Sequence, residues 1–251
     1  MHIHQIHTTI ALSIVGILFN AHTFAQVPDV EPSIAISGNV TLATDYRFRG
    51  ISQTSNDPSI QGGININHKS GFYLSLWAAN VNLLPGNSTE ADYFLGYQWK
   101  INEKSTLDFQ YIDVNYPGAI KEFHPDFSEF SVIYSRNNNY KPKDNITLSA
   151  YFSPEFAMKS GKEFYLNSSV SYPLMDNLNA IASIGYTHLE STEKFQQAYG
   201  YGTRNDYLDY KIGVKANLLG IDTELSWIDT NIQQGPKSIN GSLYFALSKN
   251  F

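Results

Sequence analysis

The chain has 251 residues, a formal net charge of −6 and no cysteine. A modestly acidic chain without basic runs gives no reason to expect nucleic-acid binding. The lack of thiols excludes disulfide staples, thiolate metal sites, a catalytic cysteine and a lipid-modified N-terminal cysteine. No stretch after Ala25 is long and apolar enough for a transmembrane helix. A membrane β-barrel remains open, because its alternating strands contain no long apolar run.

The first 25 residues have the pattern of a cleaved signal peptide. An apolar run covers residues 9–19, and Thr23 and Ala25 supply small residues at positions −3 and −1 of a cleavage site. The leading region departs from the usual pattern, because it contains histidines but no Lys or Arg. The run is too short to cross a membrane comfortably as an anchor. We therefore predict a signal peptide at 1–25, a short periplasmic segment at 26–33 and a barrel at 34–251.

Twelve segments of the remaining chain alternate between apolar and polar or small residues, as expected for strands with one apolar face. The clearest is 207–218, in which Leu208, Tyr210 and Ile212 alternate with Asp209, Lys211 and Gly213. In chain order the predicted strands are 34–45, 60–68, 72–81, 91–99, 106–114, 129–135, 146–152, 163–172, 180–188, 207–218, 221–228 and 243–251.

The connections between these strands alternate in length. The odd-numbered ones are long (46–59, 82–90, 115–128, 153–162, 189–206 and 229–242), whereas most even-numbered ones are short. The segment 136–145 is intermediate and fits the rule less well. Outer-membrane barrels have short periplasmic turns and long outward loops. The sequence therefore predicts an all-β, up-and-down antiparallel transmembrane barrel of about 12 strands, located in the bacterial outer membrane.

The last strand ends on an aromatic residue. One face of it carries Leu243, Phe245, Leu247 and Phe251, and the opposite face is more polar. A soluble sandwich strand has the same local pattern, so this segment alone does not decide the fold. In a membrane barrel, we expect Phe251 to act as the assembly signal for the barrel-assembly machinery.

The polar faces of the predicted strands supply candidates for the lining of a pore. They carry both signs of charge with an acidic excess, which predicts a hydrated lumen with a weak preference for cations. The candidates are Asp45, Asn65, Asn67, Asp92, Gln98, Glu129, Asn167, Asp209, Lys211, Lys215, Asp222 and Glu224. The alternative is a lumen filled by salt-bridged side chains, as occurs in small barrels.

Two arginines, Arg47 and Arg49, follow the first predicted strand. We expect them at the mouth of the barrel, where they would steer anions or bind the phosphates of lipopolysaccharide. The alternative, which we favour, is that they form an interfacial or loop salt bridge with Asp45 or Asp57.

The first strands contain a distinctive sequence. Residues 38–54, GNVTLATDYRFRGISQT, are followed by DPSIQGG at 57–63 and by WAANV at 77–81. Together these segments resemble a proteobacterial family described as TorF-type porins, long carried as proteins of unknown function. The later strands resemble that family in layout and in the terminal Phe251. The resemblance implies an outer-membrane barrel and a pore, and it brings no established substrate and no catalytic residues.

These observations predict a porin, a passive diffusion channel for small hydrophilic solutes or ions. Its expected partners are those solutes, outer-membrane lipid and lipopolysaccharide, and the assembly machinery. A non-conducting structural or surface-adhesion barrel is the first alternative, since the long loop 189–206 could contact ligands or other cells. A lipid-acting enzyme using His188 is a distant third, because the facing strand 207–218 has no serine of matching parity and only Ser160 lies near. We expect no enzyme activity, cofactor or metal, and we regard Gly200-Tyr201-Gly202 as a flexible surface turn rather than a nucleotide site.

Overall fold

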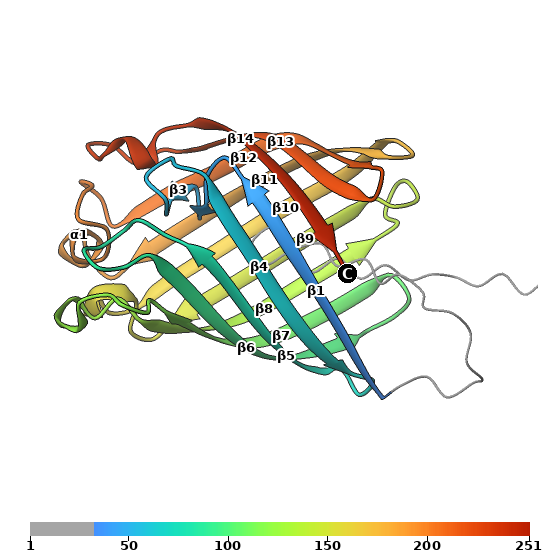
Figure 1. Cartoon of the computed structure of the whole chain (residues 1–251), viewed down its shortest axis with the longest axis horizontal. Helices are drawn as coiled ribbons and strands as arrows, with labels where there is room; N and C mark the ends of the chain where they lie inside the picture. The colour runs from blue at the N-terminus through green and yellow to red at the C-terminus, as the bar shows by residue number, and fades with distance from the viewer. Residues whose placement is uncertain (1–32) are drawn as a thin grey trace, which may run out of the picture.

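A computed structural model describes residues 33–251 and shows a closed antiparallel barrel of twelve strands. The ring runs β1-β14-β13-β12-β11-β10-β9-β8-β7-β6-β5-β4 and then returns to β1 (Figure 1). The bounds are β1 Ile34–Ala43, β4 Ser59–His68, β5 Phe72–Asn80, β6 Thr89–Lys100, β7 Ser105–Asn115, β8 Phe127–Asn137, β9 Asn145–Ser153, β10 Glu163–Met175, β11 Leu178–Leu189, β12 Asp206–Leu218, β13 Ile221–Thr230 and β14 Ser242–Asn250. The predicted signal peptide, and nearly all of the segment 26–33, lie outside the described residues.

The predicted barrel and its strand order are confirmed. The largest difference in a strand boundary is at β10, which ends at Met175 rather than at 172. The barrel closes where β1 pairs with β14, with Leu42 opposite Leu247 and Asn39 opposite Asn250. Closure gives every strand two neighbours, so no strand edge is left unpaired in an apolar surrounding.

The outer surface of the barrel is apolar along every strand. Side chains such as Ile36, Leu95, Ile212 and Leu243 are exposed on it. Aromatic side chains also lie on this face, as expected for interfacial girdles. They include Tyr93, Trp99, Tyr111, Tyr172, Tyr186, Tyr210 and Trp227. The residues that alternate with them point inward, as the sequence pattern predicts. Most of these are polar or small, but large side chains such as Tyr73, Trp77 and Tyr165 also point inward and are buried.

The connections fall at two ends of the barrel. One end, here called the short-turn end, has the connections 69–71, 101–104, 138–144, 176–177 and 219–220. The other, the long-loop end, has 44–58, 81–88, 116–126, 154–162, 190–205 and 231–241. Because the strand number is even, β1 begins and β14 ends at the short-turn end (Figure 1).

The long loops contain further elements. Loop 44–58 carries the short strands β2 (Arg47–Phe48) and β3 (Ile51–Ser52), and loop 190–205 carries the helix α1 (Thr192–Tyr199). Three 3-10 turns complete the set: η1 Lys121–Phe123, η2 Ala157–Lys159 and η3 Lys237–Ile239. Within residues 33–251, none of the helices has the length and hydropathy needed to cross a membrane.

Candidate functional site: the lumen and its constriction

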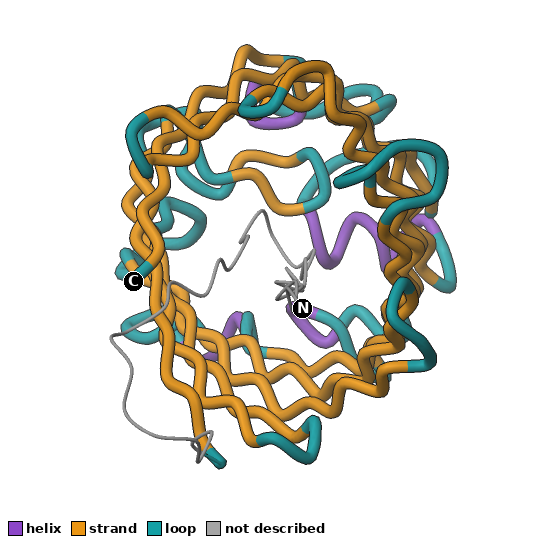
Figure 2. The backbone as a smooth tube through the Cα atoms, turned by 90° about the vertical axis from the view of Figure 1, so that its right-hand side faces the viewer, coloured by secondary structure: helices purple, strands orange, loops and turns teal. Residues whose placement is uncertain are grey.

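The loop 44–58, here called the strap, turns inward and lies inside the barrel wall. Figure 2 shows its β2–β3 hairpin within the ring of strands. Arg49 and Gly50 form the hairpin turn with positive φ of 48° and 81°, as two-residue hairpin turns of the primed type require. A Cβ on Gly50 would also lie 2.6 Å from Thr230 Cγ2 and 2.8 Å from Asp209 Cβ. Glycine therefore lets the tip of the strap sit directly against the barrel wall.

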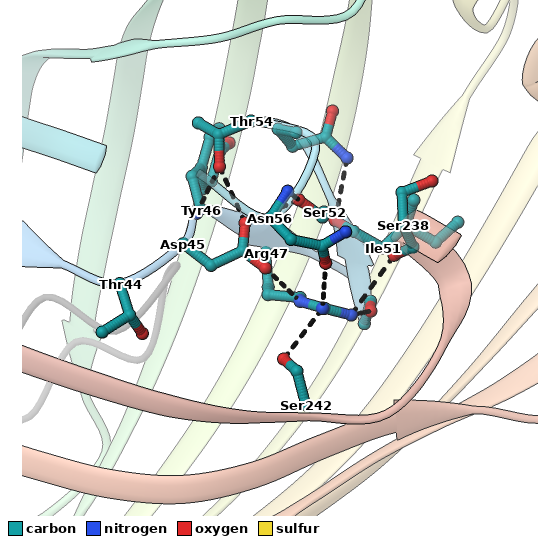
Figure 3. A network of polar contacts seen from close by, with 12 residues as sticks. Thr44, Asp45, Tyr46, Arg47, Ile51, Ser52, Thr54, Asn56, Ser238 and Ser242 are labelled. Carbon is teal, nitrogen blue, oxygen red and sulfur yellow. Dashed lines mark hydrogen bonds and ion pairs between the residues drawn. The ribbon is translucent and has the colours of Figure 1, made fainter. Parts of the chain in front are cut away.

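Arg47 fastens one side of the strap. Its guanidinium donates to Asp45 Oδ2 at 2.6 Å, to Asn56 Oδ1 at 2.8 Å and to the Gly50 carbonyl at 2.8 Å (Figure 3). It also donates to the Asn240 carbonyl at 3.0 Å and to Ser242 Oγ at 2.8 Å. The first three bonds shape the strap itself. The last two tie it to the last long loop and to β14.

Arg49 fastens the strap to the wall formed by β8 and β10. It donates to both oxygens of Glu129, at 2.7 and 2.9 Å, and to Glu163. The three side chains are only 4%, 3% and 0% exposed. The guanidinium also lies 4.3 Å from the centre of the Tyr165 ring, a cation–π contact. Burial alone would lower the pKa of Arg49, but the two carboxylates raise it well above the ordinary value, so the arginine stays charged.

Apolar side chains pack around the strap at the long-loop end. Tyr46 contacts Trp77 edge-on, with 5.2 Å between ring centres. Phe195 of α1 and Ile239 of η3 are almost fully buried in the same cluster, which also includes Phe156. The Tyr199 hydroxyl of α1 donates to Glu163 at 3.1 Å. The loops therefore pack onto the strap, and the long-loop half of the lumen is largely filled by side chains.

A cavity of about 140 Å³ remains in the lumen beside the strap. Residues of β1, β4, β12, β13 and β14 line it, together with Tyr46 and Arg47 of the strap. Its charged residues include Lys211 and Lys215, whose ammonium groups each lie 3.1 Å from one oxygen of Glu224.

The opposite side of the ring carries carboxylates. Glu90 and Asp92 lie on β6, which is six positions from β12 in the ring of twelve. Glu90 accepts a hydrogen bond from the Tyr46 hydroxyl at 2.7 Å. Asp108 of β7 accepts one from the Tyr73 hydroxyl at 3.0 Å. The lumen therefore has an acidic side at β6–β8 and a side with two lysines at β12.

The candidate lining residues occupy the inward face, but they do not form one cluster. Lys211, Lys215, Asp222 and Glu224 border the cavity described above. Glu129 is bound to Arg49. The others are spread around the ring: Asn65 and Asn67 on β4, Asp92 and Gln98 on β6, Asn167 on β10 and Asp209 on β12. Asp45 lies in the strap rather than in a strand. That these residues line a conducting path stays a prediction.

Arg47 and Arg49 lie near the long-loop end, where their partners Ser242 and Glu163 begin β14 and β10, but they do not face solvent there. Both residues are buried, with 9% and 8% exposure, because the strap carries them into the barrel. Arg47 pairs with Asp45, which was the favoured alternative. Arg49 pairs with neither Asp45 nor Asp57, but with Glu129 and Glu163 on the far wall.

Several inward residues are not among the lining candidates that the sequence predicts. Glu163 and Tyr165 fall on the same face of β10 as Asn167. The alternation along this strand therefore indicates that both side chains point inward. Glu90 falls in a loop in the sequence prediction, because the predicted strand begins at 91, two residues after the true start of β6 at Thr89. His188 lies on the outer face in register with Asp206 and stacks on Tyr186, with 6.3 Å between ring centres. Within the described residues, no group of three or more His, Cys, Asp or Glu side chains could hold a metal ion.

The turn at 200–202, expected to be a flexible surface turn, packs against α1 in the structure. Gly200 caps the C-terminus of α1 with φ of 77°, and Ser191 caps its N-terminus by accepting a hydrogen bond from the Lys194 N–H. Gly202 lies so close to Phe195 that a Cβ would approach the ring to 2.7 Å. The turn is therefore part of the packed cluster.

The chain belongs to the family Gcw_chp, described as a bacterial protein of unknown function, whose profile matches residues 29–249. A comparison with curated proteins gave no match. Among solved structures, the fold is similar to "KdgM porin", with a TM-score of 0.57 and 9% identity over 86% of this chain and 99% of that one. It is similar to "NanC porin", with a TM-score of 0.55 and 8% identity over 85% and 98%. A second KdgM structure, "in complex with disordered oligogalacturonate", gives a TM-score of 0.51 with 9% identity over 86% and 97%. At these identities the likeness shows the fold, which is that of a porin barrel.

Proposed function

We propose that this member of the Gcw_chp family is an outer-membrane porin, a passive diffusion channel for small hydrophilic solutes or ions. One observation carries the proposal: a closed barrel with an apolar outer face encloses polar and charged side chains and is narrowed by an inward-folded loop. A lipid-facing exterior explains the first feature, and a hydrated path explains the polar interior. The similarity to porin structures and the resemblance to TorF-type porins support the same function.

The proposal includes the route to the membrane. Export would use the signal peptide at 1–25, and assembly would use the C-terminal strand. Phe251 exchanges two backbone hydrogen bonds with Gly38 of β1, at 2.8 and 3.0 Å. The residue proposed as the assembly signal thus also completes the seam between the last strand and the first.

The strap would set the size limit of the channel. It crosses the lumen between the Arg47 contacts at β14 and the Arg49 contacts at β8 and β10. Loops held on a rigid barrel are suited to determining specificity. The inward carboxylates exceed the inward cations, which favours weak cation selectivity. The carboxylates are Asp45, Glu90, Asp92, Asp108, Glu129, Glu163, Asp209, Asp222 and Glu224, and the cations are Arg47, Arg49, Lys211 and Lys215.

Vesicle swelling tests the proposal. Purified protein would be reconstituted into lipid vesicles, which are then placed in isotonic solutions of glycerol, arabinose, glucose or a disaccharide. We expect swelling rates that fall with solute size, and no swelling above the empty-vesicle rate with heat-denatured protein. Correctly folded barrels that give no swelling even with glycerol would overturn the proposal.

The packing at the long-loop end favours one alternative, a non-conducting structural or adhesion barrel. The strap, α1 and η3 form an apolar cluster there, and the charges of Arg47 and Arg49 are paired. Vesicles without permeability, combined with binding of intact cells to other cells through the long loops, would support this alternative.

A further inference from the structure

The lumen cavity beside the strap has two ammonium groups that share one carboxylate. Lys211 and Lys215 each contact a different oxygen of Glu224 at 3.1 Å, and Ser226 also donates to that carboxylate at 2.7 Å. An ammonium group has three N–H donors. Each lysine has this single ion-pair partner among the described residues, and the two side chains are 27% and 23% exposed to the lumen. Several charged donors are therefore left for a bound molecule.

The same cavity offers hydrogen-bond acceptors. Asn39 is 4% exposed, and its Oδ1 atom has no partner within residues 33–251. A buried amide oxygen without a partner is unfavourable unless a water molecule or a ligand donates to it. Thr41 and Ser248 hydrogen-bond to each other at 2.8 Å on the same wall, and their hydroxyl oxygens can accept further bonds.

The second acidic residue of the cavity does not compete for the lysines. Asp222 accepts hydrogen bonds from Asn217 at 2.6 Å and from Asn250 at 2.9 Å. Both donors are neutral amides, so the carboxylate is satisfied without a cation. Of the two acidic residues that line the cavity, Glu224 is therefore the one in ion-pair contact with Lys211 and Lys215.

We propose that this cavity is a binding site for a small carboxylate that carries hydroxyl groups. The carboxylate would accept from Lys211 and Lys215 on the side away from Glu224, and a hydroxyl would donate to Asn39. The volume of about 140 Å³ is similar to that of a protein cavity that holds one six-membered ring, so it fits a three- to six-carbon hydroxy acid. The site rests on the proposed channel function, for which it names a class of solute.

Calorimetric titration of the purified barrel in detergent tests the site. D-Glycerate is the probe, glycerol the uncharged comparison and acetate the comparison without hydroxyl groups. We expect glycerate to bind more tightly than acetate, and glycerol to give no saturable binding. Equal binding of glycerate and glycerol would overturn the proposal.

Two variants should change the affinity for glycerate in opposite directions. Lys215→Gln keeps the Lys211–Glu224 pair, so no carboxylate is left unpaired, and it should weaken glycerate binding by about tenfold through loss of a charge-assisted hydrogen bond. Glu224→Gln removes the internal competitor and should tighten binding several-fold. Lys249→Gln, on the outer face at the short-turn end, is the matched control and should leave binding unchanged. Unchanged binding in Lys215→Gln, or weaker binding in a folded Glu224→Gln variant, would overturn the site.

This experiment is separate from the test of the channel. Vesicles that swell with glycerol, combined with no binding of glycerate, would refute the binding site and leave the channel standing. Saturable glycerate binding by a barrel that gives no swelling would refute the channel instead.

Discussion

Replacing Arg49 tests how strongly the strap is held in the lumen. Arg49→Met keeps an unbranched side chain of similar length, but it removes every hydrogen bond to Glu129 and Glu163. Two buried carboxylates would then face each other without a cation. Breaking a buried ion pair by removing one partner destabilises a protein by about 3–5 kcal/mol. We expect a loss of this size in the free energy of unfolding.

The reason for the loss can be isolated with a second variant. In Arg49→Met/Glu129→Gln/Glu163→Gln, the carboxylates become neutral amides, and much of the stability should return, because replacing all members of a buried charged group is often close to neutral. Arg204→Met is the control. It breaks an ion pair with Asp206 in which the arginine side chain is 73% exposed, and it should leave the free energy of unfolding unchanged.

The assay is urea unfolding of the barrel in lipid vesicles, followed by tryptophan fluorescence. A loss of less than about 1 kcal/mol in Arg49→Met, which is the typical effect of an ordinary substitution, would refute the idea that Arg49 anchors the strap. A triple variant no more stable than the single one would show that unpaired carboxylates are not the cause.

Four further predictions follow from the described contacts. Gly96→Ala should destabilise the barrel by about 1–3 kcal/mol through overpacking, because its Cβ would overlap the Tyr73 ring; the same substitution in a Tyr73→Ala background should cost less in urea unfolding. Burial alone would raise the pKa of Asp144, in the turn at 138–144, but N–H donation from Tyr140, Asn139 and Lys141 holds it below the ordinary value. Its stabilisation is therefore complete above the unfolded pKa of about 3.9 and is lost as the pH falls through the folded value, so the urea midpoints of wild type and Asp144→Asn should converge in acid; midpoints that stay equally far apart would contradict this. In variants that keep one tryptophan, brominated lipid should quench Trp99 and Trp227, which are 52% and 45% exposed on the outer face, but not Trp77, which is 3% exposed in the lumen; strong quenching of Trp77 would refute the assignment of faces. Deletion of Phe251 should reduce the heat-modifiable barrel found in outer membranes on gels, whereas Phe251→Tyr should preserve it, and normal assembly of the deletion would exclude a signal role.

The barrel could be predicted because the sequence patterns that specify its strands are local. Each strand carries its own alternation, as in Leu208, Tyr210 and Ile212 against Asp209 and Lys211, and the connections alternate in length along the chain. Bilayer hydrocarbon then leaves closure as the stable arrangement of such strands. The fold therefore follows from patterns that are visible within about ten residues of each position.

The constriction could not be predicted in the same way, because its contacts are distant in sequence. Arg49 lies 80 residues from Glu129 and 114 from Glu163. Nothing near Gly50 indicates that the turn points inward, and the polar residues around it are equally suited to an exposed loop. The alternation along the strand predicts that Glu163 points inward. It does not predict that the partner of Glu163 is Arg49.

Single-channel conductance in a planar bilayer would show whether the barrel conducts ions and whether the strap narrows the path. A salt gradient across the bilayer would be used with the wild-type protein and with a variant whose strap, residues 47–56, is replaced by a short glycine turn. We expect discrete conductance steps for the wild type, a reversal potential on the cation-selective side and larger steps for the shortened strap. A wild-type barrel that is folded and heat-modifiable but electrically silent, and that stays silent when the strap is shortened, would contradict the proposed channel function.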